Sequence, residues 1–323
     1  MQEPIAPAIE TQFEKDVRQG LTEYPKHLSS KYLYDTKGDK LFQDIMAMPE
    51  YYLTDREFEI LSENTVEIAA LFANGDSRFK LLELGAGDGK KTKVLLKYLS
   101  ENNFVFKYQP IDISQNALDG LEKSLSEELP NVTVETRQGT YFETLSEIND
   151  ENGTKKVILF LGSNIGNLLH EQAVEFLKSV RNLMQEDDLL FVGFDMKKNP
   201  QTVLDAYSDA AGITAAFNKN LLARMNRELD GDFNLNNFRH WEVYNPETGT
   251  AKSFLVAEKA QTVTLEKLDL KVEFEAWETI HTEISQKYND RSIQDLSRKA
   301  ELDIVTEFSD AGRHYKNFVF RRK

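Results

Sequence analysis

The sequence contains no cysteine and few histidines. Without cysteine, the chain can form no disulfide, no thiolate zinc site and no cysteine nucleophile. No two histidines have the H-x-H or H-E-x-x-H spacing of a metal site, so we expect no metal centre. The five histidines are scattered along the chain as His27, His170, His240, His281 and His314.

Long apolar runs and an excess of positive charge are also missing. No stretch approaches the roughly 18 apolar residues that are needed to cross a bilayer, and the N-terminal segment MQEPIAPAIETQFEKDV is polar and acidic. The formal net charge is −15, which would repel a nucleic-acid backbone or an anionic membrane. We therefore expect a cytoplasmic protein that binds neither nucleic acids nor membranes.

The composition is that of a folded protein in which strands and helices alternate. Hydrophobic residues make up 40% of the 323 residues and charged residues 29%, which predicts one large domain or two coupled ones. Short apolar runs alternate with segments of helical spacing, a rhythm typical of a doubly wound α/β sheet. The predicted strands cover 79–85, 105–113, 132–137, 156–162 and 188–195, and the predicted helices cover 90–99, 115–128 and 171–184.

The second half of the chain departs from this alternation. Residues 202–229 have helical spacing throughout, and 302–321 are expected to contain a helix end followed by two strands. Strand-like alternation recurs at 252–258, 261–265 and 270–275. We therefore predict an α/β core made of residues 63–196 and 286–323, and an accessory domain made of residues 1–62 and 197–285.

A glycine-rich turn directly follows the first predicted strand. It reads Glu83-Leu-Gly85-Ala-Gly87-Asp-Gly89, and Lys90 stands where a G-x-G-x-x-G dinucleotide fingerprint would need glycine. The resulting E-x-G-x-G-x-G pattern disfavours a nicotinamide dehydrogenase and favours an S-adenosylmethionine (SAM) methyltransferase. A glycine cluster alone is a weak signal, so its context matters.

Polar residues at the ends of the second and fourth predicted strands supply that context. Asp112 can accept hydrogen bonds from both ribose hydroxyls of a nucleoside. Its alternative role is to cap the next helix, which Ser114 could do equally well. The segment Gly162-Ser-Asn-Ile-Gly-Asn167 is either an ordinary turn or part of the ligand site. Since both loops lie near the strand-order switch, we expect Asn167 to reach a substrate.

Several longer blocks, spread over nearly the whole chain, occur in the order found in one enzyme family. They are 31–35 with Gly38 and 41–42, then 49–54, 83–87, 91–92, 160–167, 206–207, 209–218 and 283–288. The chain thereby resembles the histidine Nα-methyltransferases of ergothioneine biosynthesis, whose fungal relatives methylate tryptophan-derived amines. The resemblance implies a monomer with the class I SAM methyltransferase fold, a Rossmann-like doubly wound sheet, and an accessory α+β domain. The amino acid would bind between the two domains.

The resemblance also implies the residues of the site. SAM would be bound by Tyr34, Gly85, Gly87, Lys91, Asp112, Thr140, Tyr141, Gly162 and Ser163. The amino-acid substrate would be bound by Tyr51, Asn167, Tyr207, Thr214, Glu283 and Ser285. Three of these would act in catalysis: Asn167 and Tyr207 would hold the α-carboxylate, and Tyr51 would place the substrate beside the methyl group. Glu283 and Ser285 would face the imidazole.

The reaction implied is stepwise methylation of the α-amine of L-histidine to trimethylhistidine (hercynine). Ser253 departs from this pattern, because the histidine enzymes carry a methionine there, and Asn164 stands in place of a threonine. Methylation of another amino acid or amine, such as tryptophan or a derivative, therefore stays an alternative. A catalytically silent cofactor-binding module is a second alternative. The sequence identifies no general base.

Overall fold

The computed structural model describes residues 10–73, 78–141, 144 and 154–323 of the chain. The chain divides into two compact units. The smaller unit comprises residues 1–45, 207–243 and 252–283, and the larger unit comprises residues 46–206, 244–251 and 284–323.

The larger unit is built on an eight-stranded sheet. Its order is β12-β13-β6-β5-β1-β2-β3, with β4 also paired to β2, and the pairs from β6 to β3 and β4 are parallel. Strand order reverses between β1 and β5, and β13 pairs antiparallel with β6 and β12. The bounds are β1 Arg78–Leu84, β2 Val105–Asp112, β3 Thr133–Val134, β4 Arg137–Gln138, β5 Lys156–Phe160, β6 Leu189–Asp195, β12 Leu302–Ser309 and β13 Tyr315–Arg322.

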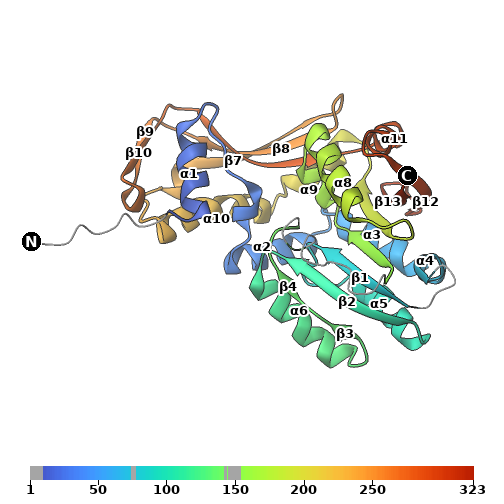
Figure 1. The fold of residues 1–323 in the computed structure, drawn as a ribbon. Helices are drawn as coiled ribbons and strands as arrows, with labels where there is room; N and C mark the ends of the chain where they lie inside the picture. The colour runs from blue at the N-terminus through green and yellow to red at the C-terminus, as the bar shows by residue number, and fades with distance from the viewer. Residues whose placement is uncertain (1–9, 74–77, 142–143, 145–153) are drawn as a thin grey trace, which may run out of the picture. The chain divides into compact units, whose positions relative to one another are not determined.

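Helices cover both faces of this sheet (Figure 1). On one face, the Phe72 ring of α4 packs on Phe79 of β1 and Phe191 of β6, with centroids 6.5 and 5.6 Å apart. On the other face, Leu177 of α8 and Leu296 of α11 belong to one apolar cluster with alternate residues of the same strands. The first layer contains α3 Leu53–Glu63, α4 Thr65–Ala73, α5 Thr92–Glu101 and α6 Gln115–Glu128; the second contains α8 His170–Leu183 and α11 Asp290–Lys299.

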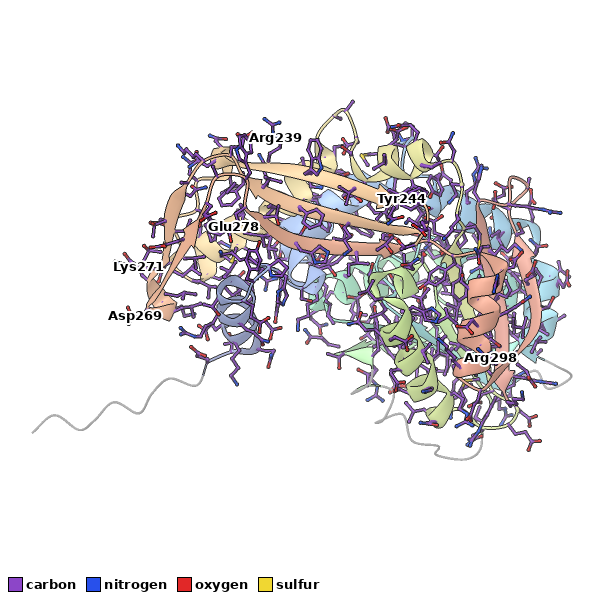
Figure 2. The ribbon with its side chains drawn as sticks, turned by 90° about the horizontal axis from the view of Figure 1, so that it is seen from above. Arg239, Tyr244, Asp269, Lys271, Glu278 and Arg298 are labelled. Carbon is purple, nitrogen blue, oxygen red and sulfur yellow. The ribbon has the colours of Figure 1, made fainter. Side chains whose placement is uncertain are left out.

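The smaller unit combines helices with short sheets. Strands β11, β8 and β7 form a three-stranded sheet in that order, and β9 pairs antiparallel with β10. Figure 2 labels Arg239 and Tyr244 near the two ends of β7. The bounds are α1 Gln12–Thr22, η1 Ser30–Leu33, α2 Thr36–Met46, α10 Ile213–Glu228, η3 Leu235–Asn237, β7 Phe238–Asn245, β8 Thr250–Ala257, β9 Gln261–Leu265, η4 Glu266–Leu268, β10 Leu270–Phe274 and β11 Thr279–Gln286. Strands β7, β8 and β11 each have residues in both units.

Polar contacts connect the elements of the smaller unit. Arg18 of α1 donates to the Leu268 carbonyl at 2.9 Å, which attaches this helix to the β9–β10 hairpin. The buried Thr282 hydroxyl of β11 lies 2.6 Å from Asn218 Oδ1 of α10 and 3.1 Å from the Ser253 carbonyl. Helix α10 is therefore held against the three-stranded sheet by side chains as well as by apolar packing.

The predicted fold class, a doubly wound α/β core with an α+β accessory part, is confirmed. Strands β1, β2, β5 and β6 and helices α5, α6 and α8 lie close to their predicted ranges. The predicted third strand is instead two short pieces, β3 and β4, and the connection that follows it lies largely outside the described residues. The segment 302–321 contains the two expected strands but no helix end, because α11 ends at Lys299.

One region that was predicted to be helical throughout is interrupted in the structure. The segment 202–229 forms two helices, α9 Pro200–Tyr207 and α10, instead of one. The carboxylate of Asp209 accepts hydrogen bonds from the backbone of Ile213 and Thr214 at 2.9 and 2.8 Å, which caps the new helix. Gly212 precedes it with φ of +76°, a conformation that glycine adopts readily.

The two units also differ from the predicted domain boundaries. Residues 46–62, 197–206, 244–251 and 284–285 lie in the larger unit, whereas the sequence placed them in the accessory domain. Helix α3 contacts β13 and α5, which joins the first of these segments to the main sheet. The assignment of cofactor and substrate roles to separate domains stays a prediction. Within the described residues, no helix is long and apolar enough to span a membrane.

A buried carboxyl group lies in the middle of the larger unit. Glu83 of β1 accepts hydrogen bonds from the Thr92 hydroxyl at 2.6 Å and the Tyr108 hydroxyl at 2.5 Å. Burial disfavours the charged form and raises the pKa of Glu83 from 4.5 to about 7, although both hydrogen bonds act in the opposite direction. The protonation state of this group therefore changes near neutral pH.

The variant Glu83→Gln tests the energetic effect of this burial. Since the pKa of Glu83 is higher in the folded chain, the group stabilises the fold below its ordinary pKa of 4.5, and this contribution is lost as pH rises through 7. Between pH 5 and pH 8, the free energy of unfolding of the unmodified chain should fall by about 2–3 kcal/mol relative to the variant. Denaturant titrations at both pH values measure the difference, and an unchanged difference contradicts the prediction.

Candidate functional site

The glycine-rich turn follows β1 in the larger unit. Gly85 has φ of +73°, and a Cβ atom there would lie 2.8 Å from both Asn164 Nδ2 and the Tyr141 hydroxyl. A larger residue would therefore be strained and would collide with both side chains. The close approach of Tyr141 and Asn164 brings residues from after β4 and β5 to the end of β1.

Asp112, at the end of β2, fixes this turn from the neighbouring strand. Its Oδ2 accepts a hydrogen bond from the Gly87 N–H at 3.0 Å, and its Oδ1 accepts one from the Ser114 N–H at 2.9 Å. Ser114 itself caps α6, since its side chain accepts from Ala117 N–H at 3.1 Å. Ser114 therefore provides the side-chain cap of α6, and the Asp112 carboxylate accepts a hydrogen bond from the glycine turn.

The loop after β5 lies beside the same turn. Gly162 and Ser163 both have positive φ, and the short helix η2 Asn164–Asn167 follows them. The Ser163 hydroxyl accepts a hydrogen bond from the Asp195 N–H at 3.0 Å, which ties this loop to the end of β6. A Cβ atom on Gly162 would lie 3.3 Å from Lys91 Nζ, so the lysine approaches the loop closely. Asn167 ends η2 with an exposed side chain.

Most of the predicted cofactor residues thus occur in one part of the larger unit. Contacts join Gly87 to Asp112, Gly85 to Tyr141, and Lys91 to Gly162. Burial raises the pKa of Tyr141 above its ordinary value, so its hydroxyl stays protonated. Tyr34 is the exception, because it belongs to the smaller unit, where its ring packs edge-on against Phe42 and Phe217. Thr140 directly precedes Tyr141.

The predicted substrate residues are distributed over both units. The larger unit contains Tyr51, Asn167 and Ser285, and the smaller unit contains Tyr207, Thr214 and Glu283. Tyr51, Tyr207, Thr214 and Ser285 are buried, whereas Glu283 is half-buried.

Two carboxylates from the neighbouring strands of the smaller unit lie beside Ser253, the position that departs from the family pattern. The buried Ser253 hydroxyl of β8 donates to Glu242 Oε2 of β7 at 2.6 Å. It also lies 3.5 Å from Glu283 Oε2 of β11. The sequence did not single out Glu242, because a glutamate in an alternating strand usually faces solvent. The Ser253 position therefore joins two carboxylates.

A second polar network surrounds Ser285 in the larger unit. The Ser285 hydroxyl accepts a hydrogen bond from Lys287 Nζ at 2.6 Å, and the same ammonium lies 2.8 Å from Asp195 Oδ2. Asp195 also pairs with Lys198 and accepts from the Tyr52 hydroxyl at 2.8 Å. Burial opposes ionisation, but the two lysines outweigh it and hold the pKa of Asp195 below its ordinary value. Sequence spacing gave no signal for this network, since its three segments, at Tyr52, 195–198 and 285–287, lie far apart along the chain.

The chain is similar to known methyltransferases over most of its length. A family model described as "Histidine-specific methyltransferase, SAM-dependent" matches residues 13–322. Histidine N-alpha-methyltransferase of Mycolicibacterium smegmatis is 37% identical over 92% of this chain and 88% of its own length. Ergothioneine biosynthesis protein 1 of Schizosaccharomyces pombe is 28% identical, over 92% of this chain and 39% of that protein. A SAM-dependent methyltransferase structure from Clostridium acetobutylicum aligns with 81% of this chain and 90% of its own, at 9% identity and a TM-score of 0.44.

Asp112 and Ser114 form a matched pair for testing the nucleoside site. Asp112→Asn removes the charged acceptor for ribose hydroxyls, so the affinity for S-adenosylhomocysteine (SAH) should fall about 10- to 100-fold. Ser114→Ala removes the helix cap and leaves the Asp112 carboxylate in place, so it should lower stability by about 1 kcal/mol and leave SAH affinity within about twofold. Isothermal titration calorimetry measures both affinities. Equal losses in the two variants would contradict a ribose contact.

Proposed function

We propose that this chain, which belongs to the family of SAM-dependent histidine-specific methyltransferases, methylates the α-amine of L-histidine stepwise to trimethylhistidine. The family match over residues 13–322 confirms the resemblance found in the sequence. The chain is accordingly a SAM-dependent N-methyltransferase with the class I fold. The single observation that most supports histidine as the substrate is the Glu283 carboxylate on β11.

The residues at the end of β1 and β2 suit SAM. The positive φ of Gly85 leaves no room for a side chain where Tyr141 and Asn164 approach, so the backbone itself lines this position. Asp112 offers acceptors for ribose hydroxyls, and Lys91 offers a cation for the carboxylate of the methionine part. Bound SAM supplies a methyl group that is activated by the positive charge on sulfur.

The reaction requires the protein mainly to align the substrate amine with the methyl group of SAM. In the proposed reaction the amine nitrogen forms a bond to the methyl carbon, the sulfur–carbon bond breaks, and the sulfur departs as a neutral thioether. The chain must present the neutral amine in line with that bond and exclude water. We propose that Asn167 and Tyr207 hold the α-carboxylate with uncharged donors and that Tyr51 positions the amine. The amine loses its proton to solvent before attack.

Recognition of the imidazole would come from one face of β11. Glu283 and Ser285 are two residues apart, so their side chains share a face of the strand. A carboxylate accepts from a ring N–H, and a hydroxyl that accepts from Lys287 can donate its own proton to the other ring nitrogen. A neutral imidazole offers one donor and one acceptor, whereas an indole offers only a donor. This pair therefore favours histidine over tryptophan.

Ser253 supports keeping a second substrate class open. The histidine enzymes carry methionine at this position, whereas here a small hydroxyl joins Glu242 and Glu283. A smaller residue changes the shape of the side-chain site, and a second carboxylate increases its negative charge. Another amino acid or amine, such as tryptophan or a derivative, is the alternative substrate. The ergothioneine pathway follows from the histidine assignment, and the monomeric state and cytoplasmic location stay predictions.

Product analysis separates these substrates. The purified chain, incubated with SAM and an equimolar pool of amino acids and tryptophan-derived amines, should convert histidine to its trimethyl form and leave the other compounds unchanged. Mass spectrometry of the pool measures every methylated product at once. A methylated indole without methylated histidine would overturn the substrate. If SAH binds but no compound is methylated, the chain is the silent cofactor-binding module.

The role of Glu283 can be tested by itself. Glu283→Ala removes a charged hydrogen-bond acceptor from the proposed imidazole site, so kcat/KM for histidine should fall about 10- to 100-fold while SAH affinity stays within about twofold. The matched control is Glu273→Ala, which removes an exposed glutamate from β10 in the same unit and should change neither quantity. Steady-state kinetics and calorimetry provide the two readouts. Parallel losses in turnover and SAH affinity for Glu283→Ala would contradict a role in side-chain recognition.

A further inference from the structure

A fully buried carboxylate lies next to the cofactor residues and is not used by the mechanism above. Glu57 is on α3, and its side chain has no exposed surface. An unpaired buried charge is strongly unfavourable, so such a group persists where several partners satisfy it. The partners of Glu57 therefore show which parts of the structure depend on it.

One oxygen of Glu57 connects two loops. Oε2 lies 2.5 Å from Lys91 Nζ and accepts a hydrogen bond from the Gly162 N–H at 2.7 Å. Lys91 directly precedes α5, in the turn that begins at the end of β1, and Gly162 follows β5. These are the two strands between which the order of the sheet reverses. A single carboxylate atom thus fixes the loops on both sides of the switch.

The other carboxylate oxygen of Glu57 is held by strand β13. Oε1 accepts a hydrogen bond from Asn317 Nδ2 of β13 at 2.9 Å. A Cβ atom on Gly193 of β6 would lie 2.2 Å from this oxygen, so the strand provides space for the carboxylate only because this residue is glycine. The Glu57 charge, after burial itself, also raises the pKa of the neighbouring Tyr315. The Glu57 carboxylate is therefore anchored to β13 through Oε1 and contacts the two loops through Oε2.

The position of Lys91 suits one part of the cofactor. Asp112 would fix the ribose at the end of β2, so the amino-acid part of SAM has to extend away from it. Lys91 and Gly162 lie on the β1–β5 side, where a cation suits the carboxylate at the end of the methionine part. Within the described residues, Glu57 is the carboxylate that pairs with the Lys91 ammonium.

We propose that Glu57 is a positioning residue that fixes the Lys91 ammonium for the α-carboxylate of the methionine part of SAM. The inference rests on the cofactor role of Lys91 proposed above. A lysine side chain loses rotational freedom when it is held in one geometry. Glu57 holds the ammonium before the cofactor binds, so less of this entropy is lost on binding. Glu57 itself touches neither substrate nor cofactor.

A pair of ligands distinguishes this role from a general structural one. SAH contains the amino-acid part, whereas 5′-methylthioadenosine has the same nucleoside and sulfur without it. In Glu57→Gln, which has the same shape without the charge, SAH affinity should fall about tenfold and methylthioadenosine affinity should stay within about twofold. Calorimetry measures both ligands. Equal losses for the two ligands would show that Glu57 merely supports the loops, and unchanged or tighter SAH binding would also overturn the proposal.

A double-mutant cycle tests whether Glu57 acts through Lys91. Lys91→Met keeps an unbranched side chain without the charge and should weaken SAH about as much as Glu57→Gln does. Adding Glu57→Gln to Lys91→Met should then change SAH affinity by less than about twofold, because the group to be positioned is gone. Losses that multiply in the double variant would overturn the proposal, since they would mean that the two residues act independently.

Two further measurements make every outcome informative. Thermal unfolding of Glu57→Gln shows whether the variant folds. If Glu57→Gln does not fold, Asn317→Ala is tested instead, because it removes the hydrogen bond to Glu57 Oε1 and leaves Lys91 in place. The affinity for SAH should then fall about threefold, and the affinity for methylthioadenosine should not change. A selective loss supports the proposal, and an equal or absent loss overturns it. If the unmodified chain does not bind SAH, the cofactor site itself is refuted, together with this inference.

Discussion

The reversal of strand order between β1 and β5 is the constraint on which the site depends. Loops that leave two neighbouring parallel strands in opposite directions open a crevice at their carboxyl ends. Gly85 and Gly162 begin these two loops, and both have positive φ. The backbone can therefore turn sharply at the point where a ligand has to approach. The sheet thus determines where a cofactor binds before any side chain determines which one.

Carboxylates, two of them fully buried and that of Asp112 partly buried, then hold these loops in place. Asp112 holds the glycine turn, Glu57 holds Lys91 and Gly162, and Asp195 holds Ser163 through its backbone and Lys287 through its side chain. Each carboxylate is satisfied by several donors, which offsets the cost of removing its charge from water. The same group therefore serves both stability and the geometry of the site. This explains why charged side chains lie inside the larger unit, where apolar side chains alone could form a core.

The parts that could be predicted from the sequence are those with a local signal. Strands β5 and β6 are buried along their whole length and are mostly apolar, and the glycine turn has a recognisable spacing. Strand β7 was missed, because polar residues such as Glu242 lie on its less exposed face while the apolar Trp241 and Val243 are exposed. The roles of Glu57 and Lys287 depend on contacts between distant segments, which spacing does not reveal. The resemblance predicts Lys91 and Ser285 as site residues but does not point to Glu57 and Lys287, which contact them.

Two neighbouring arrangements bear on which substrate the enzyme selects. The Ser285 hydroxyl is held by Lys287, which pairs with the buried Asp195, so the donor that we propose for a ring nitrogen is held in place. Glu283 has a more adaptable neighbour, since Ser253 is small and is engaged with Glu242. Selection against an indole can rest on the rigid donor, because an unmatched buried polar group is unfavourable. Tolerance among substrates with ring nitrogens can rest on the carboxylates around Ser253. If Glu283 and Ser285 recognise the imidazole as proposed, the departure at Ser253 alters the shape of this site but leaves both of these residues in place.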